Sequence, residues 1–251
     1  MNNRMTKSNI SNWEKIGNIG ILTLSNGKEN YLIEPEFVKL TDLQKWTDDT
    51  ELKGVIIRGL GRNFSAGASI NDLINLARDN SQLSQKIEAG KQILDFIEDL
   101  NIPVVASING VCFGGGLEIA LACHMRIASE NALFAFPETN LGLIPGLGGI
   151  YRITQLLGNH YVYELVLEAD MLNATNAKEI GLIDYISETK DAFELSHFKI
   201  KNLTNDRSKE VICSAMQAIR NAETMNRVDA LKIETELFCK LALKIKIHQQ
   251  E

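Results

Sequence analysis

Cysteine, histidine and proline are all scarce in this chain of 251 residues, with four of each. The cysteines include no C-x-x-C pair, so neither a disulfide scaffold nor a cysteine zinc site is expected, and a reducing, cytoplasmic location fits them best. The histidines stand apart from one another, with no H-x-H or H-E-x-x-H spacing. This leaves no imidazole cluster for catalysis or metal binding, and we expect no metal.

Positive charge is also in short supply, because 26 Lys and Arg stand against 32 Asp and Glu, for a net charge of −6. Nucleic-acid binding therefore has no electrostatic support. The one long uncharged stretch, residues 102–117, contains a proline and four glycines and ends at Glu118, so no membrane span is expected. The start, MNNRMTKSNISNWEK, lacks the apolar core of a signal peptide and is interpreted as a loose polar lead-in.

The glycine-rich motifs that bind the phosphates of a cofactor or position a nucleophile are missing as well. Three partial matches to the dinucleotide fingerprint G-x-G-x-x-G fail at their last glycine, where the chain has Phe64, Ile119 and Tyr151. No phosphate-binding P-loop occurs, and the nearest serine-hydrolase elbow, NFSAG, has Asn63 where glycine is required. The motifs for binding a nicotinamide cofactor or a nucleotide and for a serine hydrolase are therefore absent from the sequence. Carboxylates remain as the candidate catalytic groups.

Apolar β-rich runs alternate with helical patterns over most of the chain, which predicts an α/β domain with crossover helices. The expected strands cover residues 19–25, 54–59, 103–108, 126–129, 132–136 and 181–187. Beyond residue 154 helical patterns dominate, and a break near residues 185–205 separates them from the core. We expect three parts: a lead-in (1–18), an α/β core (19–190) and a helical C-terminal region (191–251).

The most informative stretch covers residues 103–152. Three glycines follow an apolar strand and open a helical run, so the Gly115 N–H could face a developing oxyanion at the start of that helix. Glu118 lies one turn into the helix, and Glu138 follows the strand near residue 136. If the chain brings both carboxylates together in an apolar pocket, one of them retains a proton near neutral pH. Considered separately, each residue has a simpler interpretation. Glu118 would be a glutamate favoured by the helix dipole, and Glu138 would be a loop carboxylate that faces solvent.

A small-residue loop, SAGA, follows the strand at residues 54–59. It would let a ligand approach backbone N–H groups, of which Ala68 is the natural candidate, although an ordinary tight turn explains it equally well. In the C-terminal tail, Lys240, Lys244 and Lys246 form a basic face. This face is either simply solvated or receives an anionic group of a substrate carrier.

Several long motifs in the same order resemble the enoyl-CoA hydratase/isomerase (crotonase) superfamily. They are GRNFSAGASI, ASINGVCFGGGLEIALAC, FPETNLGLIPGLGG and NATNAKEIGLIDYI, and the likeness covers residues 19–186 and, more weakly, the tail. The resemblance implies an α/β fold, namely a spiral of ββα repeats followed by a helical trimerisation region. A homotrimer or hexamer is the implied assembly.

The same resemblance implies the site. By motif, Ala68 and Gly115 supply the two N–H groups of an oxyanion hole for a thioester carbonyl. Glu118 and Glu138 match the two glutamates that handle water and proton in hydratases of the family. Gly146 matches the glycine whose N–H positions the water. No cofactor is implied beyond the coenzyme A thioester that carries the substrate.

The resemblance also implies positions that contact the substrate or its CoA, at Tyr31, Ala66, Ser69 and Ile70. Ser69 replaces an aspartate common in the family, and bulky Tyr31 lies in the segment that matches the adenine pocket. His124 replaces a second family aspartate and is expected to be a local repacking.

The family's closing helix motif is not recognisable, so conventional CoA contacts are in question. Besides hydration of a CoA thioester, three alternatives stay open. An isomerase or a decarboxylase could act on an acyl carrier protein thioester in a fatty-acid or polyketide type pathway, and a non-catalytic acyl-thioester-binding paralogue is the third.

Overall fold

The computed structural model describes residues 11–78 and 80–248 of the chain. Its main sheet has six strands in the order β1-β2-β3-β4-β6-β9. β1 is antiparallel to β2, and all other neighbouring pairs are parallel. The strands are β1 (Ser11–Ile16), β2 (Ile19–Leu24), β3 (Gly54–Gly59), β4 (Val104–Ile108), β6 (Met125–Ser129) and β9 (Tyr185–Ser187).

Alternation along the central strands explains why both faces of this sheet are covered. In β3, Val55 and Ile57 pack into the large core on one face, while Ile56 packs into a second cluster on the other. In β4, Val104 likewise packs into the large core and Val105 into the second cluster. Strands buried on both sides read as continuous apolar runs, which is why the sequence predicted them well.

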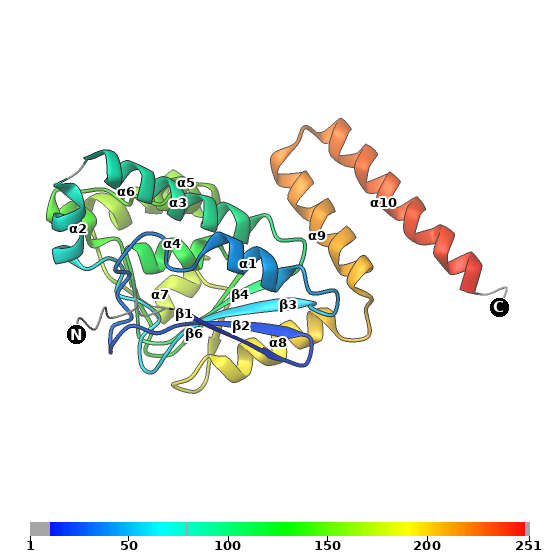
Figure 1. Ribbon diagram of the computed structural model, residues 1–251, viewed down its shortest axis with the longest axis horizontal. Helices are drawn as coiled ribbons and strands as arrows, with labels where there is room; N and C mark the ends of the chain where they lie inside the picture. The colour runs from blue at the N-terminus through cyan, green and yellow to red at the C-terminus, as the bar shows by residue number, and fades with distance from the viewer. Residues whose placement is uncertain (1–10, 79, 249–251) are drawn as a thin grey trace, which may run out of the picture.

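Helices cover both faces of the main sheet (Figure 1). α1 (Leu40–Thr47), α3 (Asn80–Glu98) and α4 (Gly115–Ala122) lie on one side, and α8 (Phe193–Thr204) lies on the opposite side. A smaller sheet of three strands, β5 (Val111–Phe113), β7 (Leu133–Ala135) and β8 (Leu172–Asn173), lies beyond β4 in the chain. The remaining elements near the core are α2 (Ile70–Ala77), α5 (Gly149–Leu157), α6 (Asn159–Tyr163), a π-helical turn (Glu164–Glu168) and α7 (Ala174–Glu179).

Two segments differ from the sequence-based expectation. The expectation of a loose lead-in over residues 1–18 is wrong for residues 11–16, which form β1 at the sheet edge, where Trp13 stacks on Trp46 at 5.1 Å; residues 1–10 lie outside the described part. The expected break near residues 185–205 contains α8, which packs on the sheet through Ile200. α8 therefore packs with the α/β core, although the division into parts placed it in the helical tail.

α9 (Lys209–Thr224) and α10 (Arg227–His248) form an arm that projects from the sheet-containing body (Figure 1). α9 is anchored to the body at both ends, because Lys209 donates to the Asp49 carbonyl at 2.7 Å and Arg220 donates to the Asp99 carbonyl. α10 packs back along α9. Over residues 11–78 and 80–248, no helix is both long enough and apolar enough to cross a membrane.

Candidate active site

Glu118 lies in a helix that is buried along its entire length. α4 runs from Gly115 to Ala122 without an exposed residue, and Glu118 itself is only 2% exposed. Its Oε1 accepts hydrogen bonds from the backbone N–H groups of Leu147 (2.7 Å) and Gly149 (2.8 Å). The glycine-rich loop at residues 142–148 therefore closes over this carboxylate and fixes its orientation.

Opposing influences act on the Glu118 carboxyl. Burial raises its pKa above the usual value, because the charged form loses hydration. The two N–H donors and the positive charges of Arg152 and Lys91 act the other way and favour the carboxylate. Burial is the larger influence, and the N–H donors and the two cations offset part of it.

Glu138 lies in a 3-10 turn (Pro137–Leu141) that follows β7. Its carboxylate rests against the turn that opens α4, since a Cβ placed on Gly114 would come within 2.7 Å of Glu138 Oε1. Gly114 has φ +50°, so both its conformation and this contact require glycine. Oε2 of Glu138 is buried and has no hydrogen-bond partner among the described residues.

The charge of Glu118 acts directly on Glu138. Burial, followed by repulsion from Glu118, raises the pKa of Glu138 to about 7. The structure thus brings the two glutamates together, as the sequence predicted. The pKa values of both carboxyls are raised, and the value of about 7 for Glu138 lets this group carry a proton near neutral pH.

The two predicted backbone donors also lie close together. A Cβ added at Gly67, the residue before Ala68, would come within 3.1 Å of the Gly115 nitrogen. Within the described residues, neither the Ala68 N–H nor the Gly115 N–H donates a hydrogen bond. Gly115 is the first residue of α4, where N–H groups are unpaired and the helix dipole is positive. These are the properties required of donors to an oxyanion.

The predicted substrate contacts lie on two adjacent segments. Leu32 N–H donates to the Gly67 carbonyl at 2.8 Å, and Ala66 N–H donates to the Glu29 carbonyl at 2.9 Å. This pairing places Tyr31 beside the loop that carries Ala66 and Ser69, the last residue before α2. Tyr31 and Ile70 are exposed, at 41% and 52%. The four predicted positions therefore form one neighbourhood beside Ala68.

The sequence did not identify the donors that hold Glu118. The N–H groups bound to its carboxylate belong to Leu147 and Gly149, whereas the resemblance implied only that the Gly146 N–H positions the water. Gly146 is the residue just before Leu147 and is partly buried. The run GLGG was a signal for backbone approach, but which amide meets the carboxylate depends on the loop's three-dimensional path.

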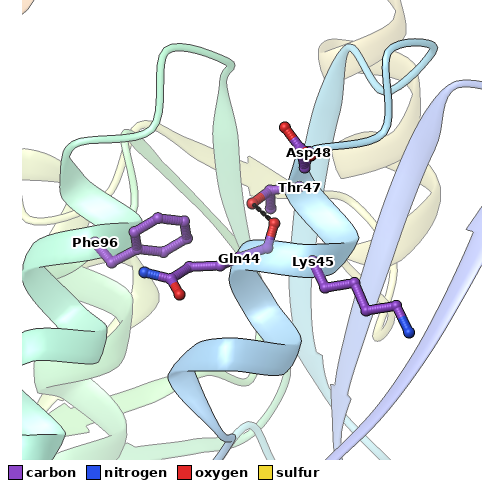
Figure 2. Close-up of a pocket in the computed structure, with 5 residues that line it drawn as sticks. All are labelled: Gln44, Lys45, Thr47, Asp48 and Phe96. Atoms are coloured by element: carbon purple, nitrogen blue, oxygen red, sulfur yellow. Dashed lines mark hydrogen bonds between the residues drawn. The ribbon is translucent and has the colours of Figure 1, made fainter.

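A surface hollow of about 410 Å³ lies elsewhere, between α1 and α3. Figure 2 shows its lining, which comprises Gln44, Lys45, Thr47, Asp48 and Phe96. It is wide open, and neither glutamate of the pair contributes to it. The paired carboxylates and adjacent donors make the Glu118–Glu138 region the better candidate. Across the described chain, no three His, Cys, Asp or Glu side chains gather to hold a metal ion.

Comparison with known proteins agrees with this geometry. The family model described as enoyl-CoA hydratase/isomerase matches residues 14–249. The chain belongs to this family. It is 33% identical over 224 residues to a probable enoyl-CoA hydratase of Bacillus subtilis (strain 168), which covers 88% of this chain and 85% of that protein. It is 31% identical to a short-chain-enoyl-CoA hydratase of Clostridium acetobutylicum over 90% of this chain and 86% of that one.

Solved structures of family members share the fold. A crystal structure of an enoyl-CoA hydratase from Geobacillus kaustophilus aligns with a TM-score of 0.86 at 28% identity, over 94% of this chain and 89% of that one. An enoyl-CoA hydratase from Polaromonas sp. JS666 aligns with a TM-score of 0.84 at 26% identity, over 92% and 90%. The predicted crotonase-like α/β fold is therefore confirmed.

Proposed function

We propose that the protein is a hydro-lyase that adds water across the 2,3 double bond of an enoyl thioester. The observation that carries this proposal is the unequal pair of glutamates beside two unused backbone donors. Family membership supports the same reaction, since relatives at about this similarity are described as enoyl-CoA hydratases.

Glu118 acts as the base, because its carboxylate is held by two N–H groups and faces two positive side chains. It takes a proton from water as the water oxygen bonds to the β-carbon and the double-bond electrons move toward the carbonyl. The resulting enolate oxygen receives hydrogen bonds from the Ala68 and Gly115 N–H groups. Glu138, whose pKa of about 7 leaves a substantial protonated fraction near neutral pH, delivers a proton to the α-carbon. The Gly146 N–H is the proposed third contact of the water.

Substrate binding is proposed at the paired segments around residues 29–32 and 66–70. The thioester carbonyl would enter beside Ala68, and Tyr31, Ala66, Ser69 and Ile70 would contact the acyl group or its carrier. The carrier itself, coenzyme A or the phosphopantetheine of an acyl carrier protein, supplies the thioester. No further cofactor takes part in the proposed steps.

The test compares hydration of crotonyl-CoA and of the same acyl group on a carrier protein, followed by loss of the conjugated enoyl absorbance. Glu118→Gln and Glu138→Gln should each lower kcat by roughly 10²–10⁴-fold, the contribution of a positioned acid or base. Glu130→Gln, at an exposed glutamate outside the site, is the matched control. Wild-type hydration rates in either active-site variant contradict the mechanism.

Other results of this assay would select the alternatives. Rapid double-bond migration or loss of carbon dioxide without hydration would identify an isomerase or decarboxylase. Turnover of the carrier-bound substrate alone would identify a carrier-protein enzyme. Tight binding of acyl thioesters without any turnover would identify a non-catalytic paralogue.

The proposal extends to assembly and location. The apolar side chains Leu231, Phe238 and Ile245 of α10 are 49%, 70% and 60% exposed, and such a stripe is typical of an interface. We propose a homotrimer or a hexamer built through the α9–α10 arm. A cytoplasmic location is proposed on the free state of the four cysteines, which suits a reducing compartment.

A further inference from the structure

Arg152 is a buried cation that contacts no reacting atom in the proposed reaction. It lies in the first turn of α5 and is 7% exposed. Its guanidinium donates three hydrogen bonds: Nη1 to the Leu147 carbonyl (2.8 Å), Nε to Glu98 Oε2 (2.8 Å) and Nη2 to Asp95 Oδ1 (2.6 Å). Arg152 thus joins α3 to the loop that closes over Glu118.

Residue Leu147 links this arginine to the catalytic carboxylate. Its carbonyl accepts from Arg152, and its N–H donates to Glu118 Oε1 at 2.7 Å. Gly149, whose N–H is the second donor to Oε1, lies three residues before Arg152 in the same helix. Both donors to Glu118 therefore belong to a short segment that Arg152 anchors.

We propose that Arg152 is a positioning residue for Glu118, which holds the Leu147–Gly149 segment in place so that both N–H groups stay directed at one carboxylate oxygen. This inference rests on the proposed function, because it assigns Arg152 to the orientation of the proposed base. Asp95 and Glu98, with side chains 64% and 47% exposed, would orient the guanidinium from the solvent side.

An arginine suits this position better than a lysine. Three acceptors from α3 and the loop are met at once by one planar group with a fixed arrangement of donors. A lysine carries a single compact ammonium and would satisfy the acceptors only in part. The carboxylates of Asp95 and Glu98 also compensate the positive charge of Arg152. Burial of an arginine without such partners would be unfavourable.

Arg152 also acts on the charge of Glu118. The groups that face Glu118 are Arg152 from α5, Lys91 from α3 and Glu138 from the turn after β7. The two cations lower the pKa of Glu118, whereas the charge of Glu138 opposes ionisation. Loss of Arg152 should therefore raise the pKa of Glu118 and shift the acidic limb of the activity profile to higher pH.

The kinetic test compares Arg152→Met and Arg152→Lys with the wild type over a range of pH. For Arg152→Met we expect kcat to fall roughly 10- to 100-fold, as for a misplaced reacting group, with a much smaller change in KM. The acidic limb of the activity profile should move to higher pH. Arg152→Lys should show both changes to a smaller extent. An unshifted limb with unchanged kcat overturns the proposal.

A second buried arginine provides the matched control. Arg126 is 6% exposed and donates to the carbonyls of Leu182 (2.8 Å) and Cys123 (2.8 Å), without contact to the loop over Glu118. Arg126→Met should lower stability but leave the acidic limb in place; an equal shift in Arg126→Met overturns a specific role for Arg152. Should Arg152→Met fail to fold, Asp95→Asn combined with Glu98→Gln alters only the exposed partners, and it must show the fall in kcat in a weaker form or the proposal is wrong.

A spectroscopic experiment tests this inference independently of the proposed function. If the wild type hydrates no enoyl thioester, the proposed function has failed, and Glu118 can still be titrated through the ¹³C signal of its labelled carboxyl, assigned with Glu118→Gln. A higher titration midpoint in Arg152→Met than in the wild type supports the anchoring of Glu118 by Arg152. Equal midpoints overturn it, whatever reaction the enzyme performs.

Discussion

The two glutamates of the site share a neighbourhood but differ in their hydrogen bonds. Glu118 Oε1 receives two backbone N–H groups, whereas Glu138 Oε2 is buried and has no partner in the described chain. A carboxylate is stabilised by donors to its charged form, and an unpaired buried oxygen favours the neutral acid. This asymmetry favours the proton on Glu138, which supports the proposed roles of Glu118 as base and Glu138 as acid.

A proton held at a raised pKa has a consequence for stability. Glu138 has a folded-state pKa of about 7 against 4.5 for the unperturbed group, so the unfolded state releases its proton first as the pH rises. The stability that this group provides is complete below pH 4.5 and is lost as the pH rises through about 7. Glu138→Gln cannot ionise and should escape this loss.

We therefore expect the free energy of unfolding of Glu138→Gln to improve relative to the wild type by up to about 3 kcal/mol between pH 4.5 and pH 8, and by less where solvent screens the partly exposed carboxyl. Urea unfolding at several pH values measures the difference, with Glu188→Gln at an exposed site as the control. A difference that stays constant with pH would mean that Glu138 is not held in its neutral form.

At the scale of elements, the proposed oxyanion hole depends on a close approach between the 66–69 loop and the start of α4. Gly67 has φ +80°, and a Cβ there would lie 2.7 Å from the Phe113 carbonyl oxygen and 3.1 Å from the Gly115 nitrogen. Any side chain at this position must push the two segments apart. The Ala68 and Gly115 donors would then no longer converge on one oxygen.

Gly67→Ala should accordingly lower kcat by roughly 10²–10³-fold, the loss seen when one oxyanion donor is removed. Gly61→Ala is a matched control, because Gly61 has the same φ of +80° and nothing within 4 Å of its added Cβ. Both variants carry similar backbone strain, but only the first has a steric clash. Equal kcat values for the two variants would show that the approach at Gly67 has no catalytic importance.

The sequence predicted the parallel strands of the main sheet because their buried residues form continuous apolar runs, but β5 and β8 of the smaller sheet, with three and two residues, were not among the expected strands. It missed α8, whose buried face contains Ser196, Ile200 and Thr204 at intervals of four. The two hydroxyls donate to carbonyls of the helix itself, at Ala192 and Ile200, so polar residues could be buried without an apolar pattern. β1 was missed for a related reason, since an edge strand with alternating polar residues resembles an unstructured polar segment.

The residues of the candidate site also divide into those that the sequence revealed and those that it did not. Glu118, Glu138 and the small-residue loop were found from motifs, because glycines and carboxylates next to buried strands leave a clear sequence signal. Arg152 left no such signal, since its partners Asp95 and Glu98 lie more than fifty positions earlier in the chain. His124 was expected to be a local repacking, and its Nδ1 accepts the Val104 N–H at 2.9 Å.

At the scale of the whole molecule, the arm changes the interpretation of the basic tail. Lys240 and Lys244 both pair with Glu210 of α9, and this pairing helps to hold α10 alongside α9. Their charge is thus partly neutralised within the arm, which disfavours a role in binding an anionic carrier; the side chain of Lys246 lies outside the described residues. The feature of α10 without a partner is its apolar face, not its basic one.

That apolar face leads to the prediction for assembly. Leu231, Phe238 and Ile245 recur at intervals of seven, so they lie along one side of α10, and all three side chains are exposed. Burying such a stripe against other copies of the chain would remove a large apolar surface from water, whereas a monomer would leave it hydrated. We expect the wild type to be a trimer or hexamer in light scattering at micromolar concentration.

Phe238→Glu combined with Ile245→Glu should reduce the scattering mass toward that of the 27.9 kDa single chain, because association would bury unpaired charge. Tyr163→Glu, at a residue 63% exposed on α6 and outside the arm, should leave the assembly intact. Circular dichroism checks that the double variant keeps its helices. A wild type that scatters only as the single chain would show that α10 does not mediate assembly, and the exposed face would then need a different partner.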